Sequence, residues 1–173
     1  MADKHLILVR HAKSSWADSR LPDHDRPLNA RGMRNAPLMG ARAQALGILA
    51  DALITSSALR ARTTAEHFWD ALDPTPAKLR VESDLYHADV ATWLAFIESL
   101  PDTWSSVMAF GHNPGLTELA ADVWDLPVNN VPTCGVLWLT FTGPTWKETA
   151  TRRPVTALFD YPKNPSNLPE ALR

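Results

Sequence analysis

Short apolar runs alternate along this chain with longer stretches in which apolar residues recur every three or four positions. Short runs of this kind are typical of buried strands, and the longer stretches are typical of amphipathic helices. Because parallel strands need a helical crossover between them, this order predicts an α/β fold: a single-domain, three-layer sandwich with a mostly parallel central sheet and helices on both faces. The strands are expected at residues 6–9, 52–55, 79–81, 106–110, 136–141 and 155–159.

Polar residues suited to helix caps precede the expected helices. Asn29 or Asn35 can cap the helix after the first strand, which would place Pro37 in or near its first turn. Asp89 can cap the helix before residues 106–110. The last twelve residues contain prolines, which cannot donate backbone hydrogen bonds. We therefore expect residues 1–161 to form the domain and residues 162–173 to form an irregular C-terminal tail against it.

Composition limits the partners and the compartment. The 173 residues carry a formal net charge of −2, so no overall basic field attracts nucleic acid, and any anion site must be local. Glycine, proline and asparagine interrupt the longest uncharged segment, 128–146, which argues against a membrane span. The N-terminus lacks a signal-peptide pattern, and the single cysteine, Cys134, cannot form an internal disulfide. These features predict a cytoplasmic protein without nucleic-acid or membrane partners.

Polar motifs directly follow three of the expected strands. Arg10 and His11 follow the first strand, Ser56 follows the second, and His112 follows residues 106–110. In open α/β sheets, ligands bind beyond the carboxyl ends of the strands, so these motifs are expected to meet at one rim. Guanidinium groups bind phosphate oxygens bidentately, and an imidazole can act as a nucleophile. The pattern therefore indicates a phosphate site with a built-in nucleophile.

From Leu6 to about Val136 the chain resembles the histidine phosphatase superfamily, which has the phosphoglycerate-mutase-like fold, and most closely its SixA-type phosphohistidine phosphatases. The resemblance rests on the segments Arg10–Ala12, Arg26–Gly32, Ser56–Thr64 and Gly111–Gly115, which occur in the family's order and at its usual spacing. The family's commonest signature is Arg-His-Gly, and this chain has Ala12 in place of the glycine. A small residue can replace that glycine unless the backbone needs a positive φ.

The resemblance assigns roles to four residues. It implies that His11 is the nucleophile, attacking phosphorus through Nε2 while a backbone carbonyl holds the Nδ1 proton. It implies that Arg10 and Arg62 bind the phosphate and that His112 stabilises charge in the transition state. Arg60, two residues before Arg62, is expected to point elsewhere on the helix and to be structural.

Two further residues are candidates for phosphate or substrate binding. Arg26 can reach the phosphate rim or form an ion pair with Asp23 or Asp25, and both interpretations stay open at this point. Asn113 belongs to the turn that starts the following helix, and its amides can add to an anion site.

The general acid is the least defined part of the motif. Relatives that cleave phosphate esters use a carboxylate shortly before a Tyr-Gly segment to protonate the leaving oxygen. The best-matching position here is Ser83, so Asp84 is the first candidate and Glu82 the second, and a plain surface carboxylate is the other interpretation of either. Phosphohistidine tolerates a weaker or missing acid, because its imidazole departs easily once protonated.

Together the residues and the resemblance predict a cofactor-independent phosphohydrolase that removes phosphate from phosphohistidine on a protein. Only a short segment separates Arg62 from Val90, whereas relatives acting on sugar phosphates usually carry a long helical insertion there. A broad small-molecule phosphomonoesterase and a catalytically silent phosphate-binding module remain as alternatives. The histidines lack the spacing of metal ligands, and no glycine loop cradles a nucleotide phosphate, so we expect neither a metal nor a cofactor.

Overall fold

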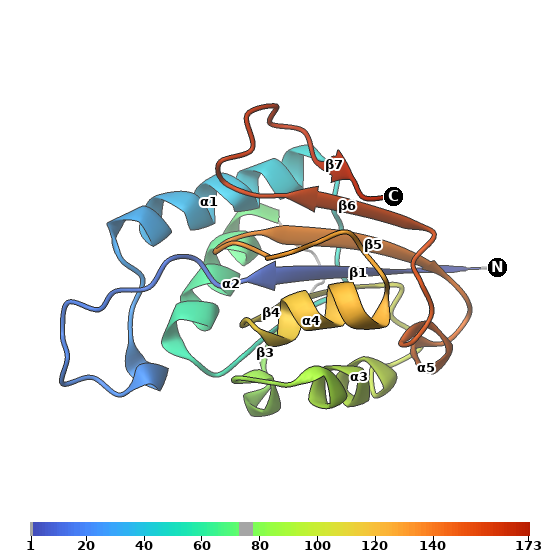
Figure 1. Cartoon of the computed structure of the whole chain (residues 1–173), viewed down its shortest axis with the longest axis horizontal. Coiled ribbons are helices and arrows are strands. Elements are labelled where there is room, and N and C mark those ends of the chain that lie inside the picture. Colours follow the sequence, from blue (N-terminus) through green and yellow to red (C-terminus); the bar gives the residue numbers. More distant parts are fainter. Residues whose placement is uncertain (1, 73–77) are drawn as a thin grey trace.

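The computed structural model describes residues 2–72 and 78–173, and its centre is a sheet with the strand order β3-β2-β4-β1-β5-β6-β7 (Figure 1). The strands are β1 (Asp3–Arg10), β2 (Ala52–Thr55), β3 (Lys78–Val81), β4 (Ser106–Gly111), β5 (Val136–Thr142), β6 (Thr156–Asp160) and β7 (Glu170–Ala171). The six expected strands are all present, with ends that shift by at most a few residues.

The sheet is mixed, so the prediction of a mostly parallel sheet is wrong. Strands β3, β2, β4 and β1 pair in parallel, whereas β5 pairs antiparallel with β1 and with β6, and β7 pairs antiparallel with β6. The connection from β5 to β6 contains only a turn and the one-turn helix α5 (Trp146–Thr149). Such a short connection returns the chain beside the strand it has just left, which favours antiparallel pairing.

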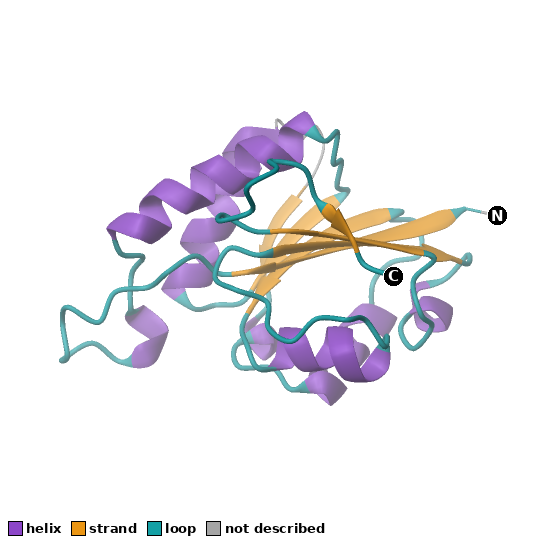
Figure 2. Ribbon diagram, turned by 45° about the horizontal axis from the view of Figure 1, so that its top comes forward, coloured by secondary structure: helices purple, strands orange, loops and turns teal. Residues whose placement is uncertain are grey.

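Helices cover both faces of the sheet, which confirms the three-layer sandwich (Figure 2). One face carries α1 (Ala30–Ala45) and α2 (Leu59–Leu72), and the other carries α3 (Val90–Glu98), α4 (Gly115–Glu118), the π-helical turn η3 (Leu119–Val123) and α5. Strand β1 supplies both cores, because alternate side chains of a strand point to opposite faces. Leu6 and Leu8 pack with α3 and α4, while Ile7 and Val9 pack with α1 and α2.

Side-chain caps determine where two of the helices begin. The Asn29 side chain accepts a hydrogen bond from the Gly32 amide, and the Asp89 side chain accepts one from the Thr92 amide. Asn29 rather than Asn35 is the cap. Pro37 therefore lies inside α1, whereas the sequence had suggested a position in or near the first turn.

The C-terminal tail is more regular than its prolines suggest. Glu170 and Ala171 form β7 at the edge of the sheet, so the prediction of an irregular tail is wrong there. The buried Asn164 side chain donates to the Asp160 carboxylate at 3.0 Å and to the Leu168 carbonyl at 2.7 Å. These bonds tie residues 162–173 to the end of β6.

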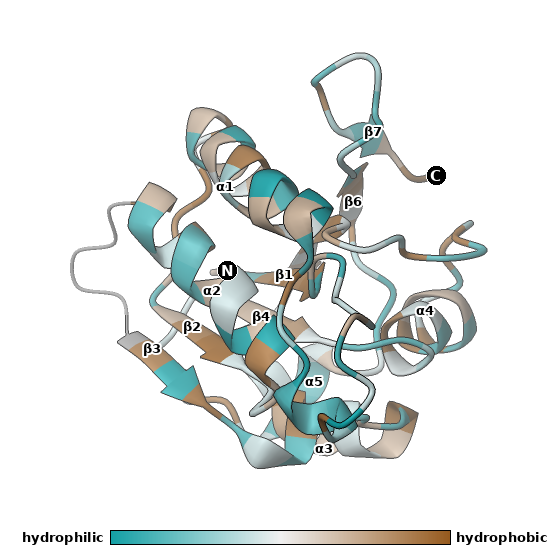
Figure 3. Ribbon diagram, turned by 90° about the vertical axis from the view of Figure 1, so that its left-hand side faces the viewer, coloured by the Kyte–Doolittle hydropathy of each residue, from teal (hydrophilic) through white to brown (hydrophobic). Residues whose placement is uncertain are grey.

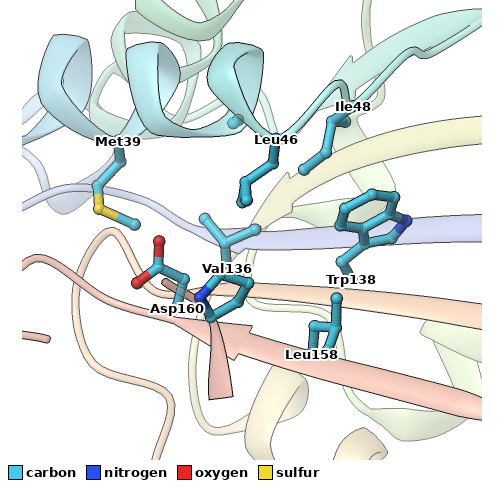
Figure 4. Close-up of a pocket in the computed structure, with 9 residues that line it drawn as sticks. Met39, Leu46, Ile48, Val136, Trp138, Leu158 and Asp160 are labelled. Atoms are coloured by element: carbon cyan, nitrogen blue, oxygen red, sulfur yellow. The ribbon is translucent and has the colours of Figure 1, made fainter. Parts of the chain in front are cut away.

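A narrow apolar crevice lies between α1 and strands β5 and β6 (Figure 4). Met39, Leu46, Val136 and Trp138 line it, and its volume of about 10 Å³ has room for a single water molecule at most. The crevice is therefore a packing defect of the core and too small for a substrate.

The carboxyl end of β1 faces the segment that leads to α1, on the left of Figure 1. Figure 3 looks onto this rim and shows apolar strands in the interior behind largely hydrophilic loops. The short helices η1 (Asp23–Asp25) and η2 (Ser83–Leu85) lie in loops that follow β1 and β3. No helix within residues 2–72 and 78–173 combines the length and apolar character needed to cross a bilayer.

Candidate active site

A pocket of about 180 Å³ opens at the carboxyl ends of β1 and β4. It is lined by Arg10, His11, Lys13, Ser14, Trp16, Asp23, Arg26, Arg60, His87, His112, Asn113 and Thr133. Four of these side chains are cationic at neutral pH and one is a carboxylate, so the lining carries the local positive charge that the net charge of −2 hides. The pocket is suited to an anion.

His11 is buried at the base of this pocket, with 7% of its surface exposed. Its Nδ1 lies 2.7 Å from the carbonyl oxygen of Ala12, and a carbonyl only accepts, so Nδ1 carries the proton and Nε2 carries the lone pair. Burial is the largest cause of a lowered pKa for His11, and together with the positive charges of Arg60, Arg10 and Arg26 it outweighs the hydrogen bond to Ala12 and brings the pKa to about 3. The ring is therefore neutral at pH 7 and offers the lone pair of Nε2 to the pocket.

The segment around His11 is held by backbone contacts. Ala12 does not have a positive φ, which confirms that alanine can replace the family's glycine. The Ala12 amide donates to Thr64 Oγ1 at 2.9 Å, and that hydroxyl donates to the Arg60 carbonyl at 2.7 Å. These bonds connect the end of β1 directly to the first turns of α2.

His112 lies beside His11, with 5.1 Å between their ring centroids. Its Nε2 is 2.7 Å from Ser56 Oγ, which also accepts a hydrogen bond from the Ala58 amide. Burial, as the largest cause, and the nearby His11 and Arg60 together lower the pKa of His112 to about 2. Because Ser56 engages Nε2, the nitrogen left for a ligand is Nδ1.

Arg10 and Asn113 are linked through one backbone carbonyl. Arg10 Nη1 donates to the Val131 carbonyl at 3.0 Å, and Asn113 Nδ2 donates to the same oxygen at 2.9 Å. The Asn113 carbonyl oxygen accepts from Thr117. Both predicted residues line the pocket, but the Asn113 amide is occupied within the fold and orients the loop that holds Arg10.

The arginine of α2 that enters the pocket is Arg60 and not Arg62, which corrects the sequence prediction. Arg60 is 3% exposed, and its Nη1 and Nη2 donate to Asp23 at 2.7 and 3.0 Å, whereas Arg62 is exposed on the helix and does not line the pocket. Residues two apart on a helix point in nearly opposite directions. Position 60 shares its helix face with the buried Thr64 and Phe68, and this i, i+4, i+8 spacing is the signal that could have identified it.

The position of Arg26 is compatible with both interpretations drawn from the sequence. It lines the pocket with 5% exposure, and its Nε lies 3.5 Å from the Asp23 carboxylate. Its guanidinium also donates to Ser14 Oγ and stacks 3.4 Å from the ring centroid of Trp16. An indole under a guanidinium is a favourable cation–π arrangement.

The two predicted general acids lie outside the pocket. Asp84 is exposed and lines a separate shallow depression with Ser83 and Asp89. Glu82 uses its carboxylate to accept from the Asp84 amide at 3.2 Å. Asp84 lies in η2 and Glu82 directly precedes this helix, and neither side chain lines the pocket that holds His11. The sequence motif does not reveal this local geometry.

The carboxylate that does line the pocket is Asp23, which the sequence suggested only as a partner of Arg26. Partial burial raises the pKa of Asp23, but hydrogen bonds from Tyr86 at 2.6 Å, His87 at 3.0 Å and Arg60 at 3.0 Å outweigh it and hold the pKa below its usual range. Asp23 is therefore ionised at neutral pH. His87, like Asp23, lines the pocket and was not predicted as a site residue.

Several buried donors of the pocket arginines lack a hydrogen-bond partner within the described part of the chain. They are Nε of Arg10, Nε and Nη1 of Arg26, and Nε of Arg60. Buried donors of this kind call for a ligand or solvent partner, because an unsatisfied polar group is costly. Across residues 2–72 and 78–173, no cluster of three or more histidine, cysteine or acidic side chains has the geometry of a metal site.

Comparisons with known proteins agree with this site. The family profile described as the histidine phosphatase superfamily (branch 1) matches residues 6–95. An uncharacterized chloroplastic protein of Arabidopsis thaliana is 32% identical over 84% of this chain and 70% of its own length. An uncharacterized protein of Mycobacterium tuberculosis strain H37Rv is 38% identical over 65% of this chain and 67% of its own length.

Solved structures show the same fold. A protein provisionally named phosphohistidine phosphatase SixA from Agrobacterium tumefaciens aligns with a TM-score of 0.71 at 28% identity, over 79% of this chain and 90% of that one. A protein histidine phosphatase SixA complexed with tungstate aligns with a TM-score of 0.69 at 23% identity, over 91% and 94% of the two chains.

The chain therefore belongs to the histidine phosphatase superfamily, the class of phosphatases with a histidine nucleophile. Within that superfamily it is similar to the proteins named SixA.

Proposed function

We propose that this protein removes the phosphoryl group from phosphohistidine on other proteins, without a cofactor, through a phosphorylated His11. The observation that carries the proposal is a neutral imidazole at the base of a cationic pocket. His11 offers the lone pair of Nε2, and the Ala12 carbonyl holds Nδ1 in the tautomer that this attack requires.

The two steps follow from the positions of the side chains. Arg10, Arg26, Arg60 and His112 surround the space where the phosphoryl oxygens would lie. The three guanidinium groups neutralise charge on these oxygens, and the uncharged His112 can donate a hydrogen bond from Nδ1. Nε2 of His11 forms a bond to phosphorus as the bond to the substrate nitrogen breaks and the leaving imidazole takes up a proton. Water then attacks phosphorus, the bond to Nε2 breaks, and inorganic phosphate and neutral His11 result.

The rim around the pocket supports a protein substrate. Among the described residues between α2 and α3, the chain forms only the strand β3 and the single-turn helix η2, so no long helical element lies there. Trp16 at the edge of the pocket is 72% exposed, and Lys13 lines the same edge. A phosphorylated side chain on a folded partner can reach a pocket bordered in this way. The resemblance to proteins named phosphohistidine phosphatase agrees with this choice.

The test offers the purified protein a histidine-phosphorylated carrier protein and a panel of sugar phosphates, without added metal, and measures phosphate release. We expect faster release from the carrier protein. Acid-labile, alkali-stable phosphate should be trapped on His11, and His11→Asn should lose turnover by up to ~10⁶-fold, as nucleophile losses do elsewhere.

Other outcomes would replace the proposal. Faster cleavage of a sugar phosphate than of any phosphohistidine protein would indicate the small-molecule phosphatase. Phosphate binding without turnover would indicate the catalytically silent module. An acid-stable label would move the nucleophile from His11 to a nearby serine such as Ser14 or Ser56.

A further inference from the structure

One titratable side chain of the pocket has no part in the two steps above. His87 lines the pocket with its side chain about half exposed, and its Nε2 lies 3.0 Å from the Asp23 carboxylate. Its ring stacks on His112, with centroids 5.1 Å apart, and packs against Tyr86 at 4.2 Å. The imidazole therefore borders the site where the phosphoryl group would bind, on the side of His112.

The backbone holds this ring in place. His87 has a φ of 51°, a left-handed conformation that histidine adopts more readily than most residues. The next residue, Ala88, packs so tightly that a Cβ at Gly115 would lie 2.1 Å from its carbonyl oxygen. Leu85, two residues before His87, is fully buried. Contacts on both sides therefore present the imidazole to the pocket.

Several groups in or beside the pocket are poor candidates for proton exchange with a substrate. His11 supplies the attacking lone pair, and burial holds the pKa of His112 at about 2. Asp23 accepts three hydrogen bonds and stays ionised. Burial and the bond to Asp23 raise the pKa of Tyr86. Guanidinium groups keep their protons at neutral pH.

We propose that His87 is the proton donor and acceptor of this site and that Asp23 is its positioning residue. Asp23 holds the Nε2 proton, which leaves Nδ1 for exchange. In the first step, Nε2 of His11 bonds to phosphorus, the bond to the leaving atom breaks, and the Nδ1 proton of His87 moves to that atom. In the second step, water bonds to phosphorus and gives a proton to Nδ1 of His87, while the bond from phosphorus to His11 breaks. This inference rests on the proposed phosphatase reaction.

How much a reaction needs a proton donor depends on its leaving group. If His87 had only a structural role, its substitution would slow all substrates alike, so a loss that depends on the leaving group identifies a proton donor. Phenoxide is a poor leaving group, whereas 2,4-dinitrophenoxide departs without protonation. The experiment measures kcat/KM at pH 7 for the two aryl phosphates, because this constant reports the steps up to transfer to His11. The variant is His87→Gln, whose amide can still donate to Asp23. His67→Gln, on the partly buried side of α2 outside the pocket, is the matched control.

We expect His87→Gln to lower kcat/KM for phenyl phosphate by ~10²-fold or more, the usual effect of losing a general acid. The dinitrophenyl ester should lose less than about threefold, and the control should match the wild type on both. Asp23→Asn should also lower kcat/KM more for phenyl phosphate than for the dinitrophenyl ester, by a smaller factor than His87→Gln. If Asp23 served only to hold Arg60, its substitution would slow both esters alike. His87→Gly suits the positive φ and provides a second variant if the glutamine variant folds poorly.

Equal losses on both esters, or no loss on either, would overturn the role of His87 and leave the proposed function standing. A wild type that cleaves phosphohistidine but neither aryl phosphate would also overturn it, because an effective proton donor permits oxygen leaving groups. A wild type that cleaves no phosphorylated substrate and takes no label on His11 would overturn the proposed function and this inference together.

Discussion

Nη2 of Arg60 lies 3.5 Å from Nδ1 of His112, so a side chain from α2 and one that follows β4 face the same small volume. Their neighbours fix both groups. Ser56 engages the far nitrogen of His112, and Asp23 accepts from both terminal nitrogens of Arg60. The donors that would bind a phosphoryl group are thus ordered by protein contacts before an anion arrives, which is the arrangement that lowers the free energy of a charged transition state.

The first prediction compares the two arginines of α2. Arg60→Gln should lower kcat by ~10²- to 10³-fold, as expected when one preorganised charge-stabilising donor is removed. Arg62→Gln removes the same charge two residues away on the exposed face and should stay within about twofold, the small effect typical of a surface change. Steady-state kinetics on a phosphohistidine protein measure both. A larger loss for Arg62→Gln would restore the role that the sequence motif suggested.

The second prediction concerns anion binding. Tungstate or inorganic phosphate should raise the Tm of the wild type, because a ligand that binds only the folded state stabilises it by about 2.7 kcal/mol at a hundred times its Kd. Arg60→Gln should remove most of this shift and Arg62→Gln should keep it. Sodium chloride at matched ionic strength is the control. Equal shifts in all three proteins would place the anion outside the pocket.

The third prediction follows from the depressed pKa values of His11 and His112, about 3 and about 2. The unfolded chain binds protons at these residues below about pH 6.5, whereas the folded protein does not until near pH 3. The contribution of these two histidines to the free energy of unfolding is therefore fully present above about pH 6.5, and it is lost as the pH is lowered. Each histidine can contribute up to about 2 kcal/mol of that loss between pH 7 and pH 5.

Denaturant unfolding at both pH values, for the wild type and His11→Asn, checks the third prediction. The variant should lose less stability on acidification than the wild type, whatever its stability at pH 7. The same loss in both proteins would mean that His11 is protonated in the folded state at pH 5.

The fourth prediction concerns Asp84 of η2 and Glu82, which directly precedes that helix. Asp84→Asn and Glu82→Gln should each leave phosphohistidine and phenyl phosphate cleavage within about twofold, because neither side chain lines the pocket. Kinetic constants on both substrates provide the measurement. A loss above ~10²-fold in either variant would identify a general acid that reaches the substrate only after a rearrangement of η2.

The fifth prediction concerns the C-terminal tail. Asn164→Ala removes two buried hydrogen bonds and leaves the Asp160 carboxylate with one donor fewer, so the free energy of unfolding should fall by about 1–3 kcal/mol. The exposed Arg173→Ala is the control. Both variants should keep kcat/KM close to the wild-type value. An increase in KM with unchanged stability would show instead that the tail contacts the substrate.

Local sequence patterns and motifs were sufficient to predict part of the fold and part of the candidate site. Apolar periodicity located the six long strands, because a buried strand needs a run of apolar side chains whatever surrounds it. The polar residues after β1 and β4 could be placed at one rim for a similar reason, since parallel strands end on the same side. His11 and His112 were accordingly identified from the sequence, and they lie 5.1 Å apart.

Other parts depended on contacts between distant segments. Asp23 and His87 are 64 residues apart and meet only because the loops carrying η1 and η2 fold over the same rim. Arg60, and not Arg62, lies in the pocket because the packing of α2 decides which face of the helix turns toward β1. Local spacing in the sequence was enough to predict the strands and the helical layers, and the family motif was enough to select His11 as a candidate. Which charged side chains surround His11 depended on the folded domain, because loop geometry and helix rotation are set by packing across the whole domain.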